Sequence, residues 1–486
     1  MPFPRLPLLL ALFAVPSLAT AAEQAVPPPS VWNETTVQRL ADTLSNASMD
    51  GLNPQDYPLP PEWSAARETA LETALLTYAA DLSQGRVRPH EREDWRISPS
   101  PLDPNRLLAA AAMGGDVLAE ALNQLAPPHE GYRLLRQSLI GYQQIAENGG
   151  WPQIPDGPPL RLGTADPRLD LLRERLRLTG DLSADAGGGP TLDTATLAAL
   201  KSFQARHGLP PDGQLGPRSL AALNIPVEQR IAQITANLER WRWLPRHFEP
   251  LRIEAHITDA TVRLIDHGTT LLSMRSVVGH PETPTPSLIG ELEYIVVNPP
   301  WFVPDSITAR EILPEVRKDP FFLAANNMSV LDRRNLSPIM TPIDWNSFEA
   351  GNFPYRIRQE PGPDNSLGQI KFHMKDGGSI FLHDTPERHE FALDERALSH
   401  GCVRVEKPVE LAAMALDQPE KWTSESLHAL IGEGKTRWLK PRQPIAVYLF
   451  YWTAWVDEDG RVQFREDIYG RDEIILSALT RRKGEG

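Results

Sequence analysis

The stretch from Ser379 to Arg404 reads SIFLHDTPERHEFALDERALSHGCVR, and the rest of the chain is best understood from it. It contains Cys402, the only cysteine among 486 residues, and His383, which ends a short apolar run. A lone cysteine with a histidine nearby is a candidate nucleophile and base. The thiolate is the attacking form and a free thiol has a pKa of roughly 8.5, so a positioned imidazole is needed at neutral pH. Gly401 lets the backbone turn sharply and point N–H groups at a reacting carbonyl.

The spacing within this stretch resembles a known enzyme signature. His383 is followed by a spacer of 15 residues and then by the sequence SHGCVR, from Ser399 to Arg404. This pattern is similar to the signature of the YkuD-type L,D-transpeptidase catalytic domain, whose members cross-link bacterial peptidoglycan. The alternative is that Cys402 is a small buried hydrophobe, as free cysteines often are. Its polar neighbours form no apolar pattern, so we favour a nucleophile.

The resemblance implies an acyl transfer in two steps through a cysteine acyl-enzyme. Cys402 attacks the carbonyl of the L-centre of diaminopimelate, the third residue of a donor tetrapeptide stem, and terminal D-alanine leaves. An amine of a second stem then attacks the thioester and forms a 3→3 cross-link. His383 is the expected general base, oriented by the backbone carbonyl of Asp384. The family often has Gly at that position. Transfer to water, or to a lipoprotein lysine, stays an alternative, as does a non-catalytic wall-binding scaffold.

Four further residues of the motif are candidates for the site. The resemblance implies that the N–H groups of Gly401 and Cys402 form the oxyanion hole, with a contribution from His400. Arg404 is expected to hold a stem-peptide carboxylate, because its planar fork matches that geometry, and Ser399 is a second candidate for substrate contact. Two alternatives remain open: a structural ion pair for Arg404 and a scaffolding role for His400.

Composition narrows the choice of function. The net charge of −14 argues against nucleic acid as a partner, because phosphate binding needs a basic surface. The twelve histidines form no H-E-x-x-H and no His-x-His pair, which disfavours a zinc-dependent wall hydrolase. We interpret His373 and His389 as surface or internally satisfied histidines. The resemblance implies no metal and no organic cofactor. The partners that it implies for the protein are donor and acceptor stem peptides, with other cell-wall synthesis enzymes as further candidates.

Residues 1–21 have the pattern of a secretory signal. Arg5 supplies the charge, Leu6 to Val15 the apolar core, and Ala19-Thr20-Ala21 a cleavage site. We therefore expect a periplasmic protein, with an uncleaved membrane anchor as the alternative. Exported proteins often use cysteines in disulfides. A single cysteine cannot form one within the chain, which supports a chemical use for the thiol.

Three segments precede the catalytic part of this multidomain α+β chain. Residues 22–165 show mostly helical periodicity and predict a scaffold domain. Residues 166–224 resemble a small three-helix peptidoglycan-binding domain. Residues 225–248 contain a helix with apolar residues at steps of three and four, which predicts a connector. The residues that carry the peptidoglycan-binding resemblance are Leu172, Leu176, Gly180, Ala199, Phe203, Gln204, Gly208, Leu209, Asp212, Gly213, Gly216 and Leu223.

The catalytic domain is expected to cover residues 249–486. Strict alternation begins at Leu251, and a succession of short strands, Tyr355 to Ile357 among them, predicts a mostly antiparallel β domain. In the family this fold is β-sandwich-like. The interruption at 299–352 is too long for an ordinary loop and predicts an inserted helical lid. There Trp301 either contacts substrate or anchors the insertion. The segment 446–486 predicts terminal strands that complete the sheet.

Overall fold

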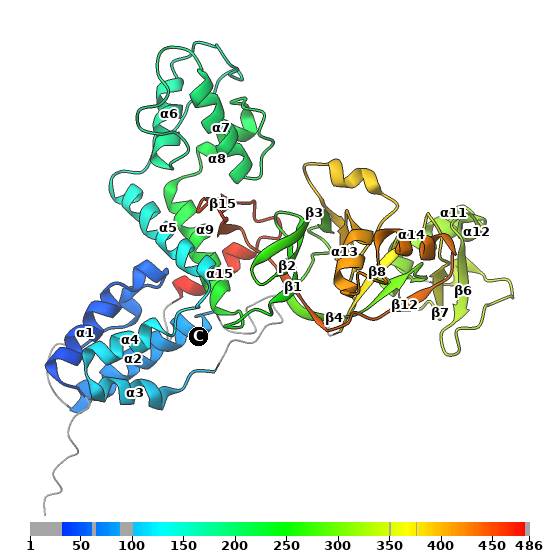
Figure 1. Cartoon of the computed structure of the whole chain (residues 1–486), viewed down its shortest axis with the longest axis horizontal. Helices are drawn as coiled ribbons and strands as arrows, with labels where there is room; N and C mark the ends of the chain where they lie inside the picture. The colour runs from blue at the N-terminus through cyan, green and yellow to red at the C-terminus, as the bar shows by residue number, and fades with distance from the viewer. Residues whose placement is uncertain (1–31, 61–64, 88–100, 349–350, 376, 482–486) are drawn as a thin grey trace, which may run out of the picture.

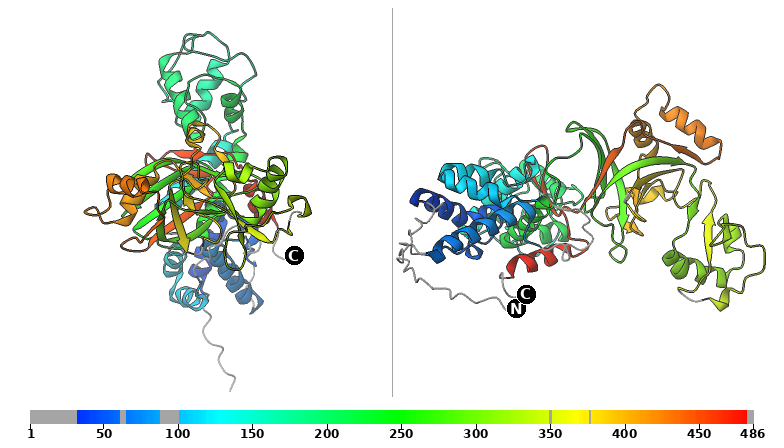
Figure 2. Two further views of the ribbon diagram at one scale, coloured as in Figure 1. Left: turned by 90° about the vertical axis from the view of Figure 1, so that its right-hand side faces the viewer. Right: turned by 90° about the horizontal axis from the view of Figure 1, so that it is seen from below.

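Three arms meet at a central joint in the computed structural model, which describes residues 32–60, 65–87, 101–348, 351–375 and 377–481. Figure 1 shows an N-terminal helical arm at the lower left, a second helical arm at the top and the β domain on the right. The two further views agree on this arrangement (Figure 2). The predicted signal segment lies outside the described residues. No helix in the described part of the chain is long and apolar enough to cross a membrane.

The first arm has its own hydrophobic core. It consists of α1 (Glu34–Ser45), α2 (Ala65–Gln84), α3 (Pro104–Met113) and α4 (Gly115–Asn123), with the short 3-10 turns Ala47–Asp50 and Pro54–Asp56. Asn33 caps α1 by accepting a hydrogen bond from the Thr36 N–H at 2.9 Å. The next helix, α5 (Glu130–Glu147), packs on the central joint instead. The segment 22–165, predicted as one scaffold domain, therefore contributes to more than one core.

The second arm is the predicted three-helix domain. Its helices are α6 (Leu169–Leu178), α7 (Thr194–Arg206) and α8 (Pro217–Leu223), which close a small core around Leu172, Leu200 and Phe203. The buried Arg173 guanidinium donates to the backbone carbonyls of Gly188, Gly189 and Thr191 at 2.8–3.2 Å. One arginine thus fixes the glycine-rich loop between α6 and α7.

The central joint is built around α9 (Val227–Arg242). It packs against α5, α15 (Arg471–Thr480) and the small sheet of β14 (Ala454–Val456) and β15 (Val462–Phe464). The helix is more than the predicted connector, because charged side chains on its inner face are buried. Glu239 accepts hydrogen bonds from Arg242 at 3.0 Å, from the Trp243 indole at 3.1 Å and from the Val87 N–H at 2.8 Å.

The β domain is a sheet that closes on itself. Strand pairing runs β3–β11–β9–β8–β4–β13–β1–β2 and returns from β2 to β3, with β10 beside β3 and β12 beside β4. Closure leaves few exposed edges, and apolar side chains fill the interior. The pairs β1–β13, β9–β11 and β3–β10 are parallel and the other pairs are antiparallel, so the mostly antiparallel domain is confirmed. The strands are β1 (Leu251–His256), β2 (Thr261–Asp266), β3 (Thr269–Gly279), β4 (Leu288–Val297), β8 (Ile370–Lys375), β9 (Leu382–His383), β10 (Ala397–Ser399), β11 (Val403–Val405), β12 (Arg437–Leu439) and β13 (Ile445–Phe450).

Closure depends on the length of β3. Its first part pairs with β2, and its last residues pair with β11 and β10. One long strand therefore belongs to both halves of what the family resemblance suggested would be a sandwich. Two helices cover the sheet near β8 and β4: α13 (Pro408–Leu416), which starts at the predicted Pro408, and α14 (Ser424–Gly432).

The insertion is a small subdomain that contains both helices and strands. A three-stranded sheet joins β5 (Trp301–Phe302), β7 (Tyr355–Gln359) and β6 (Met328–Asp332). The expectation of a helical lid over 299–352 was incomplete, because β7 belongs to this sheet and not to the main one. The helical part consists of α10 (Asp305–Ile307), a π-helical turn (Thr308–Ile312), α11 (Leu313–Lys318), α12 (Phe322–Ala325) and a 3-10 turn (Trp345–Ser347).

The C-terminal prediction of strands was correct, but only β13 completes the main sheet. β13 joins the main sheet, but β14 and β15 form a separate hairpin whose Ala454 and Phe464 are buried on the central joint. A turn at Asp459-Gly460 joins the two strands, with Gly460 at φ 77°. The helix α15 follows where strands were expected. The end of the chain therefore holds the catalytic domain against α9.

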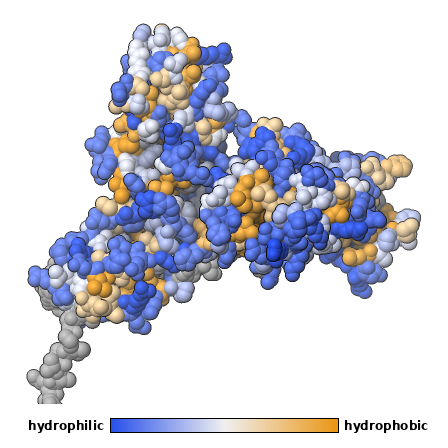
Figure 3. Space-filling model, in the orientation of Figure 1, coloured by the Kyte–Doolittle hydropathy of each residue, from blue (hydrophilic) through white to orange (hydrophobic). Residues whose placement is uncertain are grey.

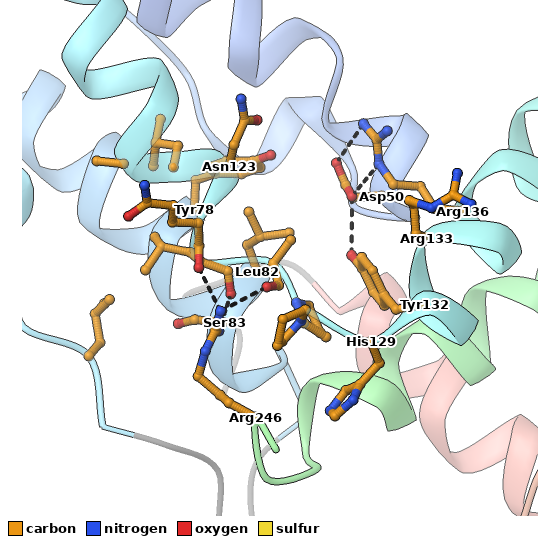
Figure 4. A pocket seen from close by; sticks show the side chains of 18 of the residues that line it. Asp50, Tyr78, Leu82, Ser83, Asn123, His129, Tyr132, Arg133, Arg136 and Arg246 are labelled. Atoms are coloured by element: carbon orange, nitrogen blue, oxygen red, sulfur yellow. Dashed lines mark hydrogen bonds and ion pairs between the residues drawn. The ribbon is translucent and has the colours of Figure 1, made fainter. Parts of the chain in front are cut away.

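The surface in the view of Figure 3 is mostly hydrophilic, with hydrophobic atoms in separate patches. Between the first arm and α5 lies a cleft of about 1030 Å³. Figure 4 shows that polar groups at this cleft bind one another: Asp50 accepts from Tyr132 and Arg136, and Arg246 reaches a nearby stretch of backbone. The carbonyls that accept from Arg246 belong to Gln124, Leu125 and Ala126.

Candidate active site

Three neighbouring strands build the site by placing two rows of side chains on opposite faces. The register of β8, β9 and β11 aligns Phe372, Leu382 and Val403, which are all buried in the hydrophobic interior. Because side chains alternate along a strand, the neighbouring positions face the other way. That second row is Lys371, His383 and Arg404. The register thus brings the predicted histidine to the strand that begins directly after Cys402.

Cys402 lies at the end of a loop, directly before β11. Its thiol donates a hydrogen bond to the Ser379 carbonyl at 3.4 Å, and the next residue, Val403, donates from its N–H to the Phe381 carbonyl at 3.0 Å. Burial raises the pKa of the Cys402 thiol, while the Phe381 N–H and the positive charges of Lys371 and Arg404 oppose that rise. The candidate nucleophile is therefore a half-buried thiol whose ionisation is opposed by burial and favoured by two nearby cations.

His383 is held as a neutral base. Burial lowers its pKa to about 3, the charges of Arg404 and Lys371 act in the same direction, and the Asp384 carbonyl opposes them. That carbonyl lies 2.5 Å from Nδ1, which is the orienting contact expected from the sequence. The Asp384 side chain accepts from the Gln369 N–H at 2.9 Å and from Arg388 at 3.1 Å. Asp at this position thus anchors the segment after the histidine, without altering the role of its backbone.

The loop before Cys402 is fixed by hydrogen bonds to its own backbone. Gly401 has φ 105°, a conformation that L residues with a side chain rarely adopt. Ser399 Oγ accepts from the Gly401 N–H at 3.2 Å and donates to the Cys402 carbonyl at 2.5 Å. Thr285 Oγ1 donates to the Gly401 carbonyl at 2.8 Å.

These contacts bear on two predictions. Ser399 is 2% exposed and its side chain braces the loop, so its contact with substrate stays a prediction that these contacts do not favour. The Gly401 N–H already has an acceptor, so it is not available to an oxyanion in this arrangement. The N–H of Cys402 remains as the predicted donor beside the sulfur.

Arg404 forms the ion pair that the sequence left open as the alternative to carboxylate binding. Its Nη1 lies 2.5 Å from Glu390 Oε2, on the short helical turn Arg388–Ala392. The two side chains are only 18% and 15% exposed, so the Arg404 guanidinium is largely shielded from a substrate. This arrangement favours the structural ion pair, one of the two alternatives for Arg404, and its role in carboxylate binding stays a prediction.

His400 and Trp301 connect the site to the inserted subdomain. His400 Nε2 lies 2.5 Å from Glu311 Oε1, which is part of the π-helical turn of the insertion. Both side chains are about half exposed. This contact favours the scaffolding role for His400. Trp301 packs partly buried against the core of the insertion, so it anchors the insertion as the second of its two predicted alternatives.

The arrangement of an SHGC loop beside a buried, carbonyl-oriented histidine agrees with the comparison with known families. Residues 250–427 match the L,D-transpeptidase catalytic domain of the YkuD type. The chain contains an L,D-transpeptidase catalytic domain. Residues 29–139 match a family described as "Scaffold domain", and residues 167–223 match one described as "Putative peptidoglycan binding domain". These matches support the transpeptidase and peptidoglycan-binding resemblances seen in the sequence.

One curated relative and several solved structures are also similar to the chain. A protein of Haemophilus influenzae named "Putative L,D-transpeptidase" is 36% identical over 249 residues, which cover 51% of this chain and 50% of that protein. The chain thus spans half the length of this relative. An L,D-transpeptidase from Xylanimonas cellulosilytica is 14% identical over 61% of this chain and all of that one, with a TM-score of 0.19. An L,D-transpeptidase from Mycobacterium smegmatis is 14% identical over 41% of this chain and 58% of that one, with a TM-score of 0.19.

Three residues of the site were missed from sequence. Glu390 lies 14 residues before its partner Arg404, and Glu311 lies in the inserted subdomain. No local sequence pattern identifies either residue. Lys371 could have been found, because Gly377-Gly378 separates two predicted strands, and a hairpin across that turn places Lys371 near His383. His373 stacks between Tyr294 and Phe381 and His389 is exposed near Glu387, in agreement with the prediction for both. Within the described ranges, no three His, Cys, Asp or Glu side chains converge on a metal site.

Proposed function

We propose that the protein forms 3→3 cross-links between peptidoglycan stem peptides through an acyl-enzyme on Cys402. The observation that carries this proposal is the pairing of β9 with β11, which sets a buried neutral imidazole beside the strand that starts after the thiol. The domain match and the peptidoglycan-binding arm support the substrate class.

The proposed reaction begins with a neutral thiol and a neutral imidazole. As the sulfur attacks the diaminopimelate carbonyl of the donor, its proton moves to His383 Nε2, because Nδ1 is held at the Asp384 carbonyl. The Cys402 N–H stabilises the oxyanion. His383 then protonates the departing amine of D-alanine, and a thioester remains. The side-chain amine of an acceptor stem attacks the thioester, gives a proton to His383 and releases the thiol.

The test is mass spectrometry of muropeptides after incubation of the full chain with tetrapeptide-rich peptidoglycan. We expect new 3→3 cross-linked dimers with the wild type and at least a ~10³-fold loss with Cys402→Ala, since covalent catalysis is removed. Binding to sacculi is expected to be nearly unchanged. Full activity in the variant would overturn the nucleophile, whereas tripeptides without dimers would make the enzyme a carboxypeptidase.

Export to the periplasm is part of the same proposal. It is supported by the signal pattern in residues 1–21 and by the location of the substrate. N-terminal sequencing of the protein from a periplasmic extract is expected to begin after Ala21. An intact N-terminus in the membrane fraction would favour the anchor. Contact with other cell-wall synthesis enzymes also belongs to this proposal, and crosslinking in cells would test it.

A further inference from the structure

Lys371 is a half-buried cation on the same face as the catalytic pair. It lies on β8 directly opposite His383 of β9, and its Nζ lies 3.5 Å from the centroid of the Phe381 ring. The backbone of that same Phe381 lowers the pKa of the Cys402 thiol, and its carbonyl accepts from the N–H of Val403, the residue after the cysteine, at 3.0 Å. The ammonium group therefore lies over the ring of a residue that is bound to the strand beginning after Cys402.

The charge of Lys371 has no carboxylate partner within the part of the chain that the structure describes. The other cations near the loop are paired: Arg404 with Glu390, Arg388 with Asp384, and Arg275 with Glu406. Burying a lysine without an anion is unfavourable, and the ring face offsets only about 0.5–2 kcal/mol of that cost. Burial accordingly lowers the pKa of Lys371, and the charge of Cys402 opposes this change. An anion that forms nearby during the reaction would supply the Lys371 ammonium with an opposite charge.

We propose that Lys371 is a positioning residue that stabilises the Cys402 thiolate electrostatically. This role addresses a difficulty in the site, because a histidine kept neutral by burial cannot supply the positive charge that a preformed thiolate–imidazolium pair would have. A cation on the next strand supplies that charge without a proton transfer. The inference relies on the proposed function only in taking Cys402 as the nucleophile.

Several charged or titratable groups face the thiol or its neighbours, and the test has to separate Lys371 from them. His383 comes from β9, Arg404 with its partner Glu390 from β11 and the turn beside it, and His400 with Glu311 from the loop and the insertion. On β8, His373 follows Lys371 on the same face and lies 3.8 Å from Glu293 of β4. A Lys371 variant leaves all these residues in the sequence, so a shift in the pKa of the Cys402 thiol would be due to the loss of the Lys371 ammonium group.

The experiment is the rate of alkylation of the native protein by iodoacetamide as a function of pH. Cys402 is the only cysteine, so intact mass reports its modification directly. In Lys371→Met we expect the apparent thiol pKa to rise by about one unit, which lowers the rate at neutral pH about tenfold. Above both pKa values the rates should agree within roughly threefold, because thiolate nucleophilicity depends weakly on pKa. Lys371→Arg should restore most of the wild-type profile.

The matched control is Lys375→Met, which removes an exposed lysine from the same strand and the same face. It should leave the profile unchanged. Superimposable profiles for Lys371→Met and the wild type would overturn the proposal, and so would a uniform rate change at every pH, which indicates altered access. If Lys371→Met does not fold, an unshifted profile for Lys371→Gln would overturn it as well. Alkylation needs no peptidoglycan, so a shift without cross-linking activity would contradict the proposed function and leave this inference standing.

Discussion

The central joint and the catalytic face both bury charged side chains, but they treat them differently. In the joint, Glu239 and Arg242 are fully buried and bind each other, and they also form hydrogen bonds with Trp243, Val87, Tyr132 and the Asp50 carbonyl. On the catalytic face, His383 is neutral and Lys371 has no carboxylate partner within the described residues. In the joint, the Glu239–Arg242 pair is matched in the resting molecule. Beside Cys402, Arg404 is matched by Glu390, whereas the charge of Lys371, on our proposal, is matched when the sulfur becomes an anion.

The largest expected effect concerns the buried ion pair of Glu239 and Arg242 in the central joint. Glu239→Gln removes the carboxylate and leaves Arg242 buried with a weakened partner, so we expect a loss of ~3–5 kcal/mol in the free energy of unfolding. Urea denaturation followed by tryptophan fluorescence measures this, because Trp241 and Trp243 lie at the end of α9. Glu228→Gln, on the exposed side of the same helix, should change the free energy by less than ~0.5 kcal/mol. Equal effects of the two variants would show that the buried pair is not needed.

The second prediction concerns the neutral histidine. The folded pKa of His383 is about 3, below the usual ~6.5. The unfolded chain therefore takes up this proton first, and the contribution to stability is lost as the pH falls from 6.5 towards 3. Between pH 6.5 and 5 the wild type should lose ~2 kcal/mol more than His383→Gln. The difference between their urea midpoints, measured at both pH values, reports it. Parallel losses would show that the imidazole is not held neutral in the fold.

The smallest effect is expected at the exposed contact between the catalytic loop and the insertion. His400 and Glu311 are about half exposed, so Glu311→Gln should alter the free energy of unfolding by less than ~1 kcal/mol. If the contact positions the insertion, cross-linking should fall no more than about fivefold, and the difference should shrink in high salt because of screening. Glu315→Gln, one turn further along the insertion, is the control. A large, salt-independent loss would instead place Glu311 in contact with substrate.

Local patterns were sufficient for the parts of this protein that depend on neighbouring residues. The apolar stripe predicted α9, and the SHGC signature located the loop of Cys402. The helix Arg471–Thr480 shows how such patterns fail, because a short segment after several strands was assigned to the sheet. Its inner face includes Asp472, whose partner Arg240 lies far away in sequence.

The site could be predicted only in part, because several of its contacts depend on strand register. Ser399 and Arg404 have side chains suited to bind a peptide, and the sequence cannot show that one is buried and the other occupied by Glu390. Likewise β7 alternates like any strand of the main sheet, and only pairing with β5 and β6 assigns it to the insertion. Tertiary partners, and not residue types, decide these roles.

The two ends of the inserted subdomain leave the closed sheet of the β domain side by side. Val297 pairs with Ile370 across β4 and β8, and the next residues, Asn298 and Gln369, are joined by a hydrogen bond of 2.8 Å. Asn298 already has a positive φ of 49°, which suits the first position of a tight two-residue turn. Everything between them could be excised and the ends ligated into a hairpin. Evolution could exchange this module, or an engineer could transplant it, while the strands that carry the thiol keep their registration.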